Sequence, residues 1–191
     1  LPTCSGYAVS TVGFLPQSNV GTNITLTDNS LSAALPIGFN FGFYCNTYSQ
    51  FYISSNGFIT FDNTGGNGCC NGQLIPNIAS PNNLIAFAWQ DLNPALGGVV
   101  NYYTLGAAPN RILVVNFVKV PHAIGGSAIT SQVILYETTN VVEIQTASMP
   151  SNGQPHTMGI ENGNGSASLV VAGRNASVWS AASEGIRFTP N

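Results

Sequence analysis

The stretch from Phe51 to Phe61, FYISSNGFITF, constrains the fold more than any other part of the chain. Apolar and polar side chains alternate on both sides of Asn56-Gly57, a dipeptide that favours a two-residue type I′ turn. This pattern predicts a β-hairpin with its turn at Asn56-Gly57. Elsewhere, Gly and Asn interrupt every candidate helix longer than two turns, so helices are not expected.

Short strands separated by turn signals follow one another along the whole chain. Such spacing is typical of an all-β sandwich. We therefore expect a single antiparallel β-sandwich, jelly-roll-like, with long loops and two disulfides. Because no linker or second core is evident, residues 1–191 are expected to form one domain. The expected strands are 7–12, 23–27, 35–45, 51–55, 58–61, 84–89, 99–104, 111–120, 129–138, 141–146, 157–161, 169–171 and 185–189.

The chain has an unusually small share of charged residues. They make up 6% of the sequence, against about 25% in a typical soluble domain, whereas 55 of the 191 residues are Asn, Ser or Thr. A formal charge of −3 with four scattered cations excludes binding to nucleic-acid phosphates. No apolar run approaches the ~20 residues that cross a bilayer, which argues against membrane insertion. The neutral surface suits a secreted domain, or one that packs against its own copies or against sugars.

Four cysteines point to an oxidising, extracellular compartment. We favour a Cys4–Cys45 bridge together with a bridge between the adjacent residues Cys69 and Cys70. The alternative is that one of the adjacent pair bonds elsewhere while the other stays free. No C-x-x-C spacing is present, so a zinc site is not expected. The chain starts at Leu1 rather than Met, which suggests a processed product.

Several of the few charged residues adjoin apolar runs. A charge held near a core needs a partner, so we expect Arg111 to pair with Asp91 or Glu137, and Glu161 to pair with Arg187. These roles are structural, and no catalytic residue is predicted. A glycoside hydrolase, which needs two acids facing a cleft, is the remotest alternative.

No cofactor is expected. His122 and His156 each follow a proline and are expected to be plain polar loop residues. Calcium could be bound by aspartates, and the candidates are Asp28, Asp62 and Asp91. They do not fall in a D-x-D-x-D run or at EF-hand spacing. Calcium binding therefore stays open at this stage, and no metal ligand is assigned.

Carbohydrate is the second class of partner that the sequence suggests. Tyr103 and Trp179 are candidates for stacking against a glycan, with core packing as the alternative for such aromatic residues. Three N-x-[ST] patterns, at Asn23, Asn164 and Asn175, are possible N-glycosylation sites. These patterns carry weight only in a source that glycosylates its proteins.

Eight phrases of the chain stand out together: LPIGFNFGFY, FYISSNGFITF, GCCNGQLIPN, NNLIAFAWQDLNP, APNRILVVNF, VILYETTNVVEI, PHTMGIENGNG and EGIRFTPN. They resemble a recurring β module of large secreted and cell-surface proteins of Bacteroidetes-type bacteria. The resemblance implies export by the type IX system and a place in adhesion or gliding machinery. The hairpin and the W-x-D-L phrase are also distantly similar to the nidogen-type extracellular domain. The resemblance brings no catalytic residues with it.

These observations predict a non-enzymatic extracellular module at the bacterial surface. We expect a role in adhesion or as a structural building block that assembles with its own copies, or with neighbouring modules, into fibres or arrays. The alternative is a lectin-like module that binds polysaccharide.

Overall fold

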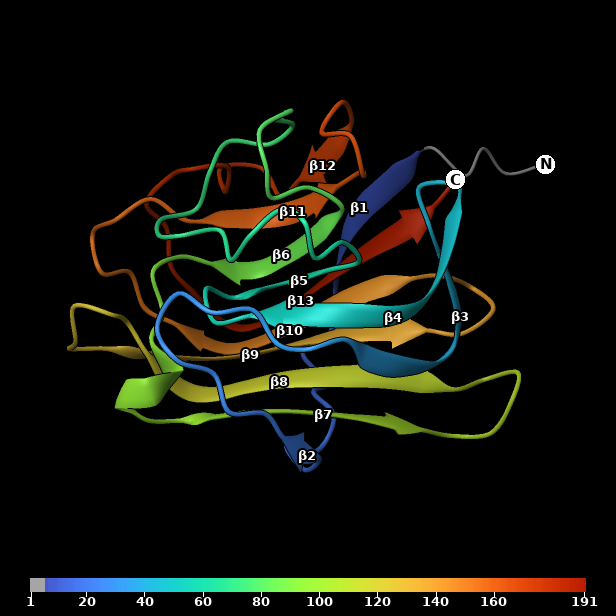
Figure 1. Ribbon diagram of the computed structural model, residues 1–191, viewed down its shortest axis with the longest axis horizontal. Coiled ribbons are helices and arrows are strands. Elements are labelled where there is room, and N and C mark those ends of the chain that lie inside the picture. The colour runs from blue at the N-terminus through green and yellow to red at the C-terminus, as the bar shows by residue number, and fades with distance from the viewer. Residues whose placement is uncertain (1–5) are drawn as a thin grey trace.

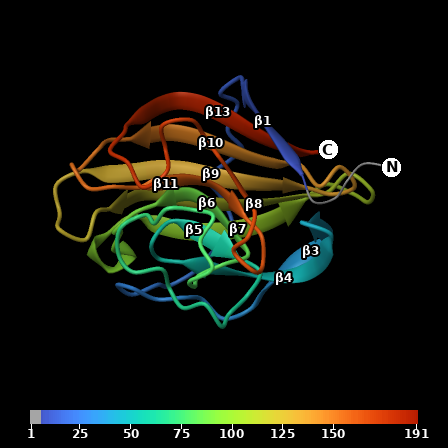
Figure 2. The same cartoon turned by 90° about the horizontal axis from the view of Figure 1, so that it is seen from above.

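The computed structural model describes residues 6–191, which form two antiparallel sheets stacked face to face. Figure 2 shows the two layers from above. Sheet A has seven strands in the order β1-β13-β10-β9-β8-β7-β2. Its strands are β1 (Tyr7–Val12), β2 (Thr22–Asn23), β7 (Val99–Leu105), β8 (Ile112–Pro121), β9 (Ala128–Tyr136), β10 (Val142–Met149) and β13 (Ala181–Pro190).

Sheet B has six strands in the order β12-β11-β6-β5-β4-β3 and lies in front of sheet A in Figure 1. Its strands are β3 (Leu35–Phe43), β4 (Asn46–Ser54), β5 (Phe58–Thr60), β6 (Leu84–Trp89), β11 (Thr157–Glu161) and β12 (Ser168–Val170), and a single short 3₁₀ helix, η1 (Pro94–Leu96), is found in the described chain. The predicted antiparallel β-sandwich is confirmed. Consecutive strands mostly lie side by side, because short turns connect antiparallel neighbours.

The main core fills the space between the two sheets. Period-two alternation places the apolar side chains of β3 inward, with Ile37, Phe41 and Phe43 at most 1% exposed. Across the interface, the ring of Phe87 on β6 meets that of Phe117 on β8 with centroids 5.1 Å apart. The fold is therefore held by the alternation that the sequence shows.

A second, smaller apolar cluster lies on the outer face of sheet B. It is formed by Phe58, Ile75, Leu84, Ala86 and Trp89. Ile75 comes from the loop of residues 61–83, which we call the disulfide loop and which covers this face. This cover explains why every residue of β6 is buried.

The central hairpin forms as predicted, but its turn is different. Ser54 pairs with Phe58, so three residues rather than two connect β4 and β5. Of the two residues expected at positive φ, only Gly57 has it, at 79°. The three-residue loop with a left-handed glycine is the next most common hairpin connection. A Cβ at Gly57 would lie 2.2 Å from the carbonyl oxygen of Ala88, so the position also requires glycine for space.

The expected strand 23–27 is the main error in the prediction of elements. Only Thr22–Asn23 pairs with a neighbour, as β2. Leu26 is nevertheless buried and Ile24 is half-buried. The alternation of apolar and polar residues thus predicted correctly which side chains face inward. It did not predict strand pairing, because pairing depends on a neighbouring strand that the sequence does not reveal.

Candidate functional site

Strand β1 forms one outer edge of sheet A. It pairs with β13 along its whole length, from Tyr7 opposite Pro190 to Val12 opposite Gly185. Its four central residues are exposed, and none of its six residues is charged. An edge strand presents backbone N–H and C=O groups that can pair with another chain. This strand is thus a potential site of strand addition.

Strand β3, the long edge strand of sheet B, is instead protected from pairing with another chain. Thr104 donates from Oγ1 to the carbonyl oxygen of Ile37 at 2.7 Å, and Arg111 donates from Nη1 to that of Gly38 at 2.6 Å. The backbone N–H of Gly42 donates to Oδ1 of Asn140 at 2.7 Å. These bonds occupy backbone groups of β3 that would otherwise be open. The other edge strands, β2 and β12, have two and three residues, so β1 is the longest unprotected edge in the described chain.

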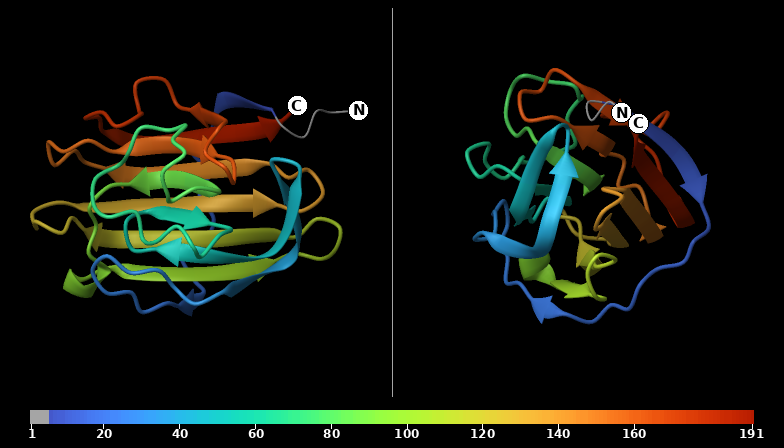
Figure 3. Two further views of the ribbon diagram at one scale, coloured as in Figure 1. Left: turned by 45° about the horizontal axis from the view of Figure 1, so that its top comes forward. Right: turned by 90° about the vertical axis from the view of Figure 1, so that its right-hand side faces the viewer.

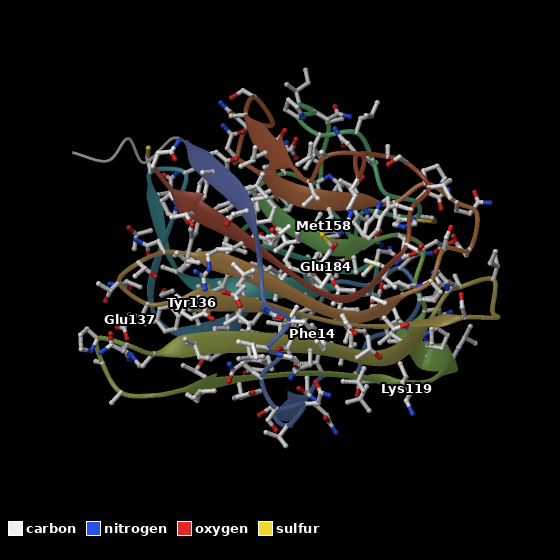
Figure 4. The ribbon with its side chains drawn as sticks, turned by 180° about the vertical axis from the view of Figure 1, so that it is seen from behind. Phe14, Lys119, Tyr136, Glu137, Met158 and Glu184 are labelled. Carbon is white, nitrogen blue, oxygen red and sulfur yellow. A yellow bond between two sulfur atoms is a disulfide. The ribbon has the colours of Figure 1, made fainter. Side chains whose placement is uncertain are left out.

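After β1 the chain crosses the outer face of sheet A and reaches β2 at the opposite edge. Figure 3 shows this path in its right-hand view, and Figure 4, seen from behind, shows Phe14 on the segment where it crosses the near face of sheet A. We call residues 7–23, which comprise β1, the crossing segment and β2, the N-terminal arm. No residue from 6 to 25 is buried, and Leu15 is 75% exposed. The arm therefore contributes no buried residue to the core, although the ring of Tyr7 packs against those of Phe43 and Tyr44.

Four side-chain amides lie in a row across the face that the arm covers. Gln145 is opposite Gln132, Gln132 opposite Asn116, and Asn116 opposite Asn101, on the neighbouring strands β10, β9, β8 and β7. Gln132 Nε2 donates to Asn116 Oδ1, and Asn116 Nδ2 donates to Asn101 Oδ1, both at 2.7 Å. We call this row the amide ladder. Each of its members is at most 3% exposed.

The amide ladder holds the arm through the backbone of the arm. Gln145 accepts from the N–H of Leu15 at 2.9 Å and donates to the carbonyl oxygen of Gly13 at 3.3 Å. Gln132 binds both backbone groups of Gln17, accepting from its N–H at 2.6 Å and donating to its carbonyl oxygen at 3.1 Å. Because a primary amide offers a donor and an acceptor, it binds an extended backbone as a neighbouring strand would.

At the far end of the arm the same kind of contact continues. Asn101 donates to the carbonyl oxygen of Asn19 at 3.2 Å, and the hydroxyl of Tyr103 donates to that of Ser18 at 2.8 Å. Tyr103, a candidate for stacking against a glycan, is thus half-buried and bonded to the arm. Sequence reasoning missed the ladder, although single Asn and Gln residues inside apolar strands were its visible signal.

The predicted ion pair at Arg111 forms with Glu137. Nε of Arg111 donates to Oε2 of Glu137 at 2.8 Å, and a second guanidinium nitrogen contacts Oε1. These hydrogen bonds lower the pKa of Glu137 to about 2. Asp91, the other expected partner, is not paired with Arg111. Burial, and then the nearby charge of Asp28, raise the pKa of Asp91, and its Oδ1 has no hydrogen-bond partner among the described residues.

The predicted pair of Glu161 with Arg187 is wrong. Arg187 instead contacts Glu143, its cross-strand neighbour, at 2.8 Å. Glu161 is fully buried beneath the disulfide loop, where Oε1 accepts from the backbone N–H of Asn77 at 2.6 Å. Burial raises the pKa of Glu161 to about 7. Glu161 lies on β11 in sheet B and Arg187 on β13 in sheet A, and sequence order alone does not reveal this separation.

Trp179 is half-buried and packs against other side chains. Its ring lies 4.3 Å from that of His156, and the guanidinium of Arg174 sits 4.5 Å from its centroid. Its Nε1 donates to the carbonyl oxygen of His156 at 3.1 Å. Arg174 in turn pairs with Glu184, with Nη2 2.7 Å from Oε2. These contacts engage the indole of Trp179, which was one of two candidates for stacking against a glycan.

Both histidines are fully buried, contrary to the expectation of plain loop residues. His122 lies 2.9 Å from the carbonyl oxygen of Ser127 and 2.8 Å from Oε1 of Gln90. His156 lies between the carbonyl oxygens of Gln154 and Trp179, at 3.0 and 2.8 Å. Burial lowers the pKa of His156. Each histidine is held by backbone carbonyl groups close to it in the chain, those of Ser127 and Gln154. A proline before each histidine does not predict this burial.

The Cys69–Cys70 bridge is present. The predicted Cys4–Cys45 bridge involves Cys4, which lies outside the described residues. The disulfide loop is held on both sides of its bridge, because Nε1 of Trp89 donates to Gly68 O at 2.9 Å and the N–H of Gly72 donates to Pro155 O at 3.2 Å.

The three possible N-glycosylation sites differ in exposure. Asn23 and Asn164 are exposed. The amide of Asn175 is not free, because it binds both the N–H and the carbonyl oxygen of Ile75, at 3.0 and 2.7 Å. Asn175 thus anchors the disulfide loop.

Two further properties hold within residues 6–191. No three His, Cys, Asp or Glu side chains come together as a metal site would require. No helix there has the length and apolar character that crossing a membrane demands.

Comparison with known proteins adds a family to this geometry. Curated proteins and solved structures gave no match. The family model described as nidogen-related, an extracellular type of domain, matches residues 6–190 and thus includes the arm, both sheets and the disulfide loop. The chain belongs to the nidogen-related (NIDO-related) family.

Proposed function

We propose that this chain is a non-enzymatic extracellular module that serves adhesion or surface structure in a bacterium and associates with copies of itself through the edge of β1. The observation that carries this proposal is the six-residue, uncharged outer strand whose central residues are exposed. Natural sheets usually protect such edges with charge, proline or a covering segment, as the side chains over β3 do here.

Two other features support the proposal. Membership of the nidogen-related family agrees with an extracellular setting. The low share of charged residues means that two copies repel each other only weakly. The bacterial setting and export by the type IX system rest on the resemblance of the core and turn phrases.

Sedimentation velocity over a concentration series, with negative-stain microscopy of the most concentrated sample, tests this proposal. We expect dimers or longer assemblies in the unmodified protein. Thr11→Lys places a charge on β1 and should weaken association, whereas Thr189→Lys, on the exposed face of the paired strand β13, should not. Monodisperse monomers at every concentration would refute self-association. A glycan array with the same protein examines the lectin-like alternative.

A further inference from the structure

We infer that a groove at one end of the sandwich binds the hydroxyl groups of a neutral glycan. The groove lies between the turn that joins β3 to β4, near the C-terminus in Figure 1, and the loop that joins β11 to β12. It has a volume of about 340 Å³ and is lined by Tyr44, Asn46, Asn162, Gly163 and Asn164. This inference goes beyond self-association through β1, because it gives the module a chemically different partner.

The first argument is the chemistry of the lining. Three of the five lining residues are asparagines, and none of the five is charged. A primary amide both donates and accepts hydrogen bonds, as a sugar hydroxyl does. A charged ligand would find no opposite charge among these residues, and an apolar ligand would find one ring. The lining therefore suits a neutral ligand that is rich in hydroxyl groups.

The second argument is the unused hydroxyl of Tyr44. The residue is 9% exposed, and its hydrogen bonds in the described chain are those of its backbone, to Tyr7 Oη and from Asn46 Nδ2. Among the described residues, the one enclosed side-chain oxygen without a partner belongs to Asp91, so the hydroxyl of Tyr44 reaches the surface. Burial, and then the nearby groups of Tyr7 and Glu161, raise the pKa of Tyr44. The hydroxyl thus keeps its proton and can donate it to a ligand.

Two asparagine amides also keep a free group. Asn46 donates from Nδ2 to the carbonyl oxygen of Tyr44 at 3.1 Å, which leaves its Oδ1 without a partner among the described residues. Asn164 accepts at Oδ1 from the hydroxyl and the N–H of Ser166, at 2.6 and 3.2 Å, which leaves its Nδ2 without one. Together with the phenol, these groups offer an acceptor, a donor and a hydroxyl. Each hydroxyl of a sugar is donor and acceptor at once and can bond to such a set.

The third argument is that both walls of the groove are held in place without a ligand. The ring of Tyr44 packs against those of Tyr7 and Phe43, with the centroids 4.9 Å apart in both pairs. In the opposite wall, Asn162 accepts from the N–H of Ser166 at 2.9 Å and donates to its hydroxyl at 3.1 Å. A site that is ordered before binding loses less conformational entropy when its ligand arrives.

The fourth argument is the backbone conformation of the β3–β4 turn. Tyr44 and Cys45 form the two-residue connection between the paired residues Phe43 and Asn46, and their φ angles are 43° and 67°. Gly, Asn and Asp are the residues favoured at both positions of such a turn. A tyrosine with positive φ costs backbone energy, and residues held in this way cluster at ligand sites. The turn therefore retains the ring and hydroxyl of Tyr44 at a position where glycine would cost less.

A glycan array of neutral and acidic oligosaccharides, followed by calorimetric titration with the neutral tetrasaccharide that gives the strongest signal, tests this inference. The protein is made in a host without N-glycosylation, because Asn164 begins an N-x-[ST] pattern. We expect binding of neutral oligosaccharides that is insensitive to salt, since no charge lines the groove. Binding of acidic glycans alone, or of no glycan at millimolar concentration, would overturn the inference.

A matched pair of variants locates the site. Tyr44→Phe removes one hydroxyl and keeps the packed ring, and it should weaken binding about fivefold. Tyr103→Phe removes a hydroxyl that bonds to Ser18 O outside the groove, and it should bind as the wild type does. Unchanged affinity in Tyr44→Phe, or a loss confined to Tyr103→Phe, would show that glycan binds elsewhere.

A third variant covers the case in which Tyr44→Phe does not fold. Asn164 is exposed, so Asn164→Ala should leave the fold intact and still weaken binding several-fold by removing the free amide donor. Wild-type affinity in Asn164→Ala would contradict the site. Sedimentation velocity of the same variant should match that of the wild type, so that loss of glycan binding and loss of self-association are told apart.

Discussion

The two outer faces of the sandwich are covered in opposite ways. The disulfide loop covers sheet B and contributes Ile75 to an apolar cluster with Trp89, Phe58 and Leu84. The N-terminal arm covers sheet A and contributes backbone hydrogen bonds to a row of buried amides. The disulfide loop and the crossing residues 13–21 both lack regular strand pairing, and the chemistry beneath them differs.

The difference between an apolar and a polar contact indicates which cover can detach from its sheet at the lower cost in free energy. Removing an apolar cover exposes side chains to water at about 25 cal/mol per Å². Removing a polar cover exchanges protein hydrogen bonds for water, at a net loss of only about 0.5–1.5 kcal/mol per bond. The disulfide loop should therefore be part of the cooperative fold, whereas the arm should open separately from it.

The largest effect is expected at Trp89. The side chain is fully buried, contacts the ring of Phe58 and bonds to Gly68 O. Trp89→Ala should lower the free energy of unfolding by about 3–5 kcal/mol, measured by chemical denaturation. Trp179→Ala, at a half-buried position, should cost less. An equal loss in both variants would show that the cover over sheet B is not a second core.

A smaller effect is expected from the buried carboxyl of Glu161. Its pKa is about 7 in the fold and near 4.5 when exposed. Below about pH 4.5 the carboxyl is protonated in both the folded and the unfolded state, so it does not lower the free energy of unfolding. As pH rises from about 4.5 to 7, the exposed carboxyl of the unfolded chain ionises while the buried one keeps its proton. Wild-type stability should therefore fall by up to about 3 kcal/mol over this range and level off above pH 7.

Glu161→Gln should remove this decline, because a neutral amide stays uncharged and can still accept from the N–H of Asn77. Denaturation curves at a series of pH values measure the effect. Glu184→Gln, which removes a carboxylate from an ion pair elsewhere, should leave the decline in place. If Glu161→Gln keeps the pH dependence of the wild type, the carboxyl is not the buried group that the geometry indicates.

The smallest effect on global stability is expected at Gln145. Gln145→Ala removes two bonds to the arm and one to Glu143, with an expected loss of about 1–2 kcal/mol. Hydrogen exchange should accelerate at residues 13–17 while β8 and β9 stay protected. Gln50→Ala, at an exposed position on β4, is the control. Uniform acceleration across the sandwich would mean that the arm does not open separately.

Several parts of this structure could be predicted because they depend on local pattern. The apolar alternation of β3 placed Ile37, Phe41 and Phe43 in the core, and the apolar run of β6 indicated a strand buried on both faces. The adjacent cysteines form the expected bridge. Arg111 was expected to need an acidic partner, and Glu137 is that partner.

Other parts could not be predicted, because they depend on which segments meet. Arg187 pairs with Glu143 since β13 lies beside β10, and Glu161 is buried under a loop that the sequence presents only as rich in Gly and Asn. The amide ladder exists because four separate strands align at one register. Single Asn and Gln residues in strands do not show that alignment.

By itself, the sequence determined an all-β chain with inward-facing alternation, few charges and an adjacent cysteine pair, because side-chain periodicity and composition are local properties. Only the tertiary structure decided that β1 forms an open edge, that residues 13–21 cross a face of sheet A, and that four amides line up to hold them. Register and strand order are set by contacts between residues far apart in the chain, and no local pattern encodes them.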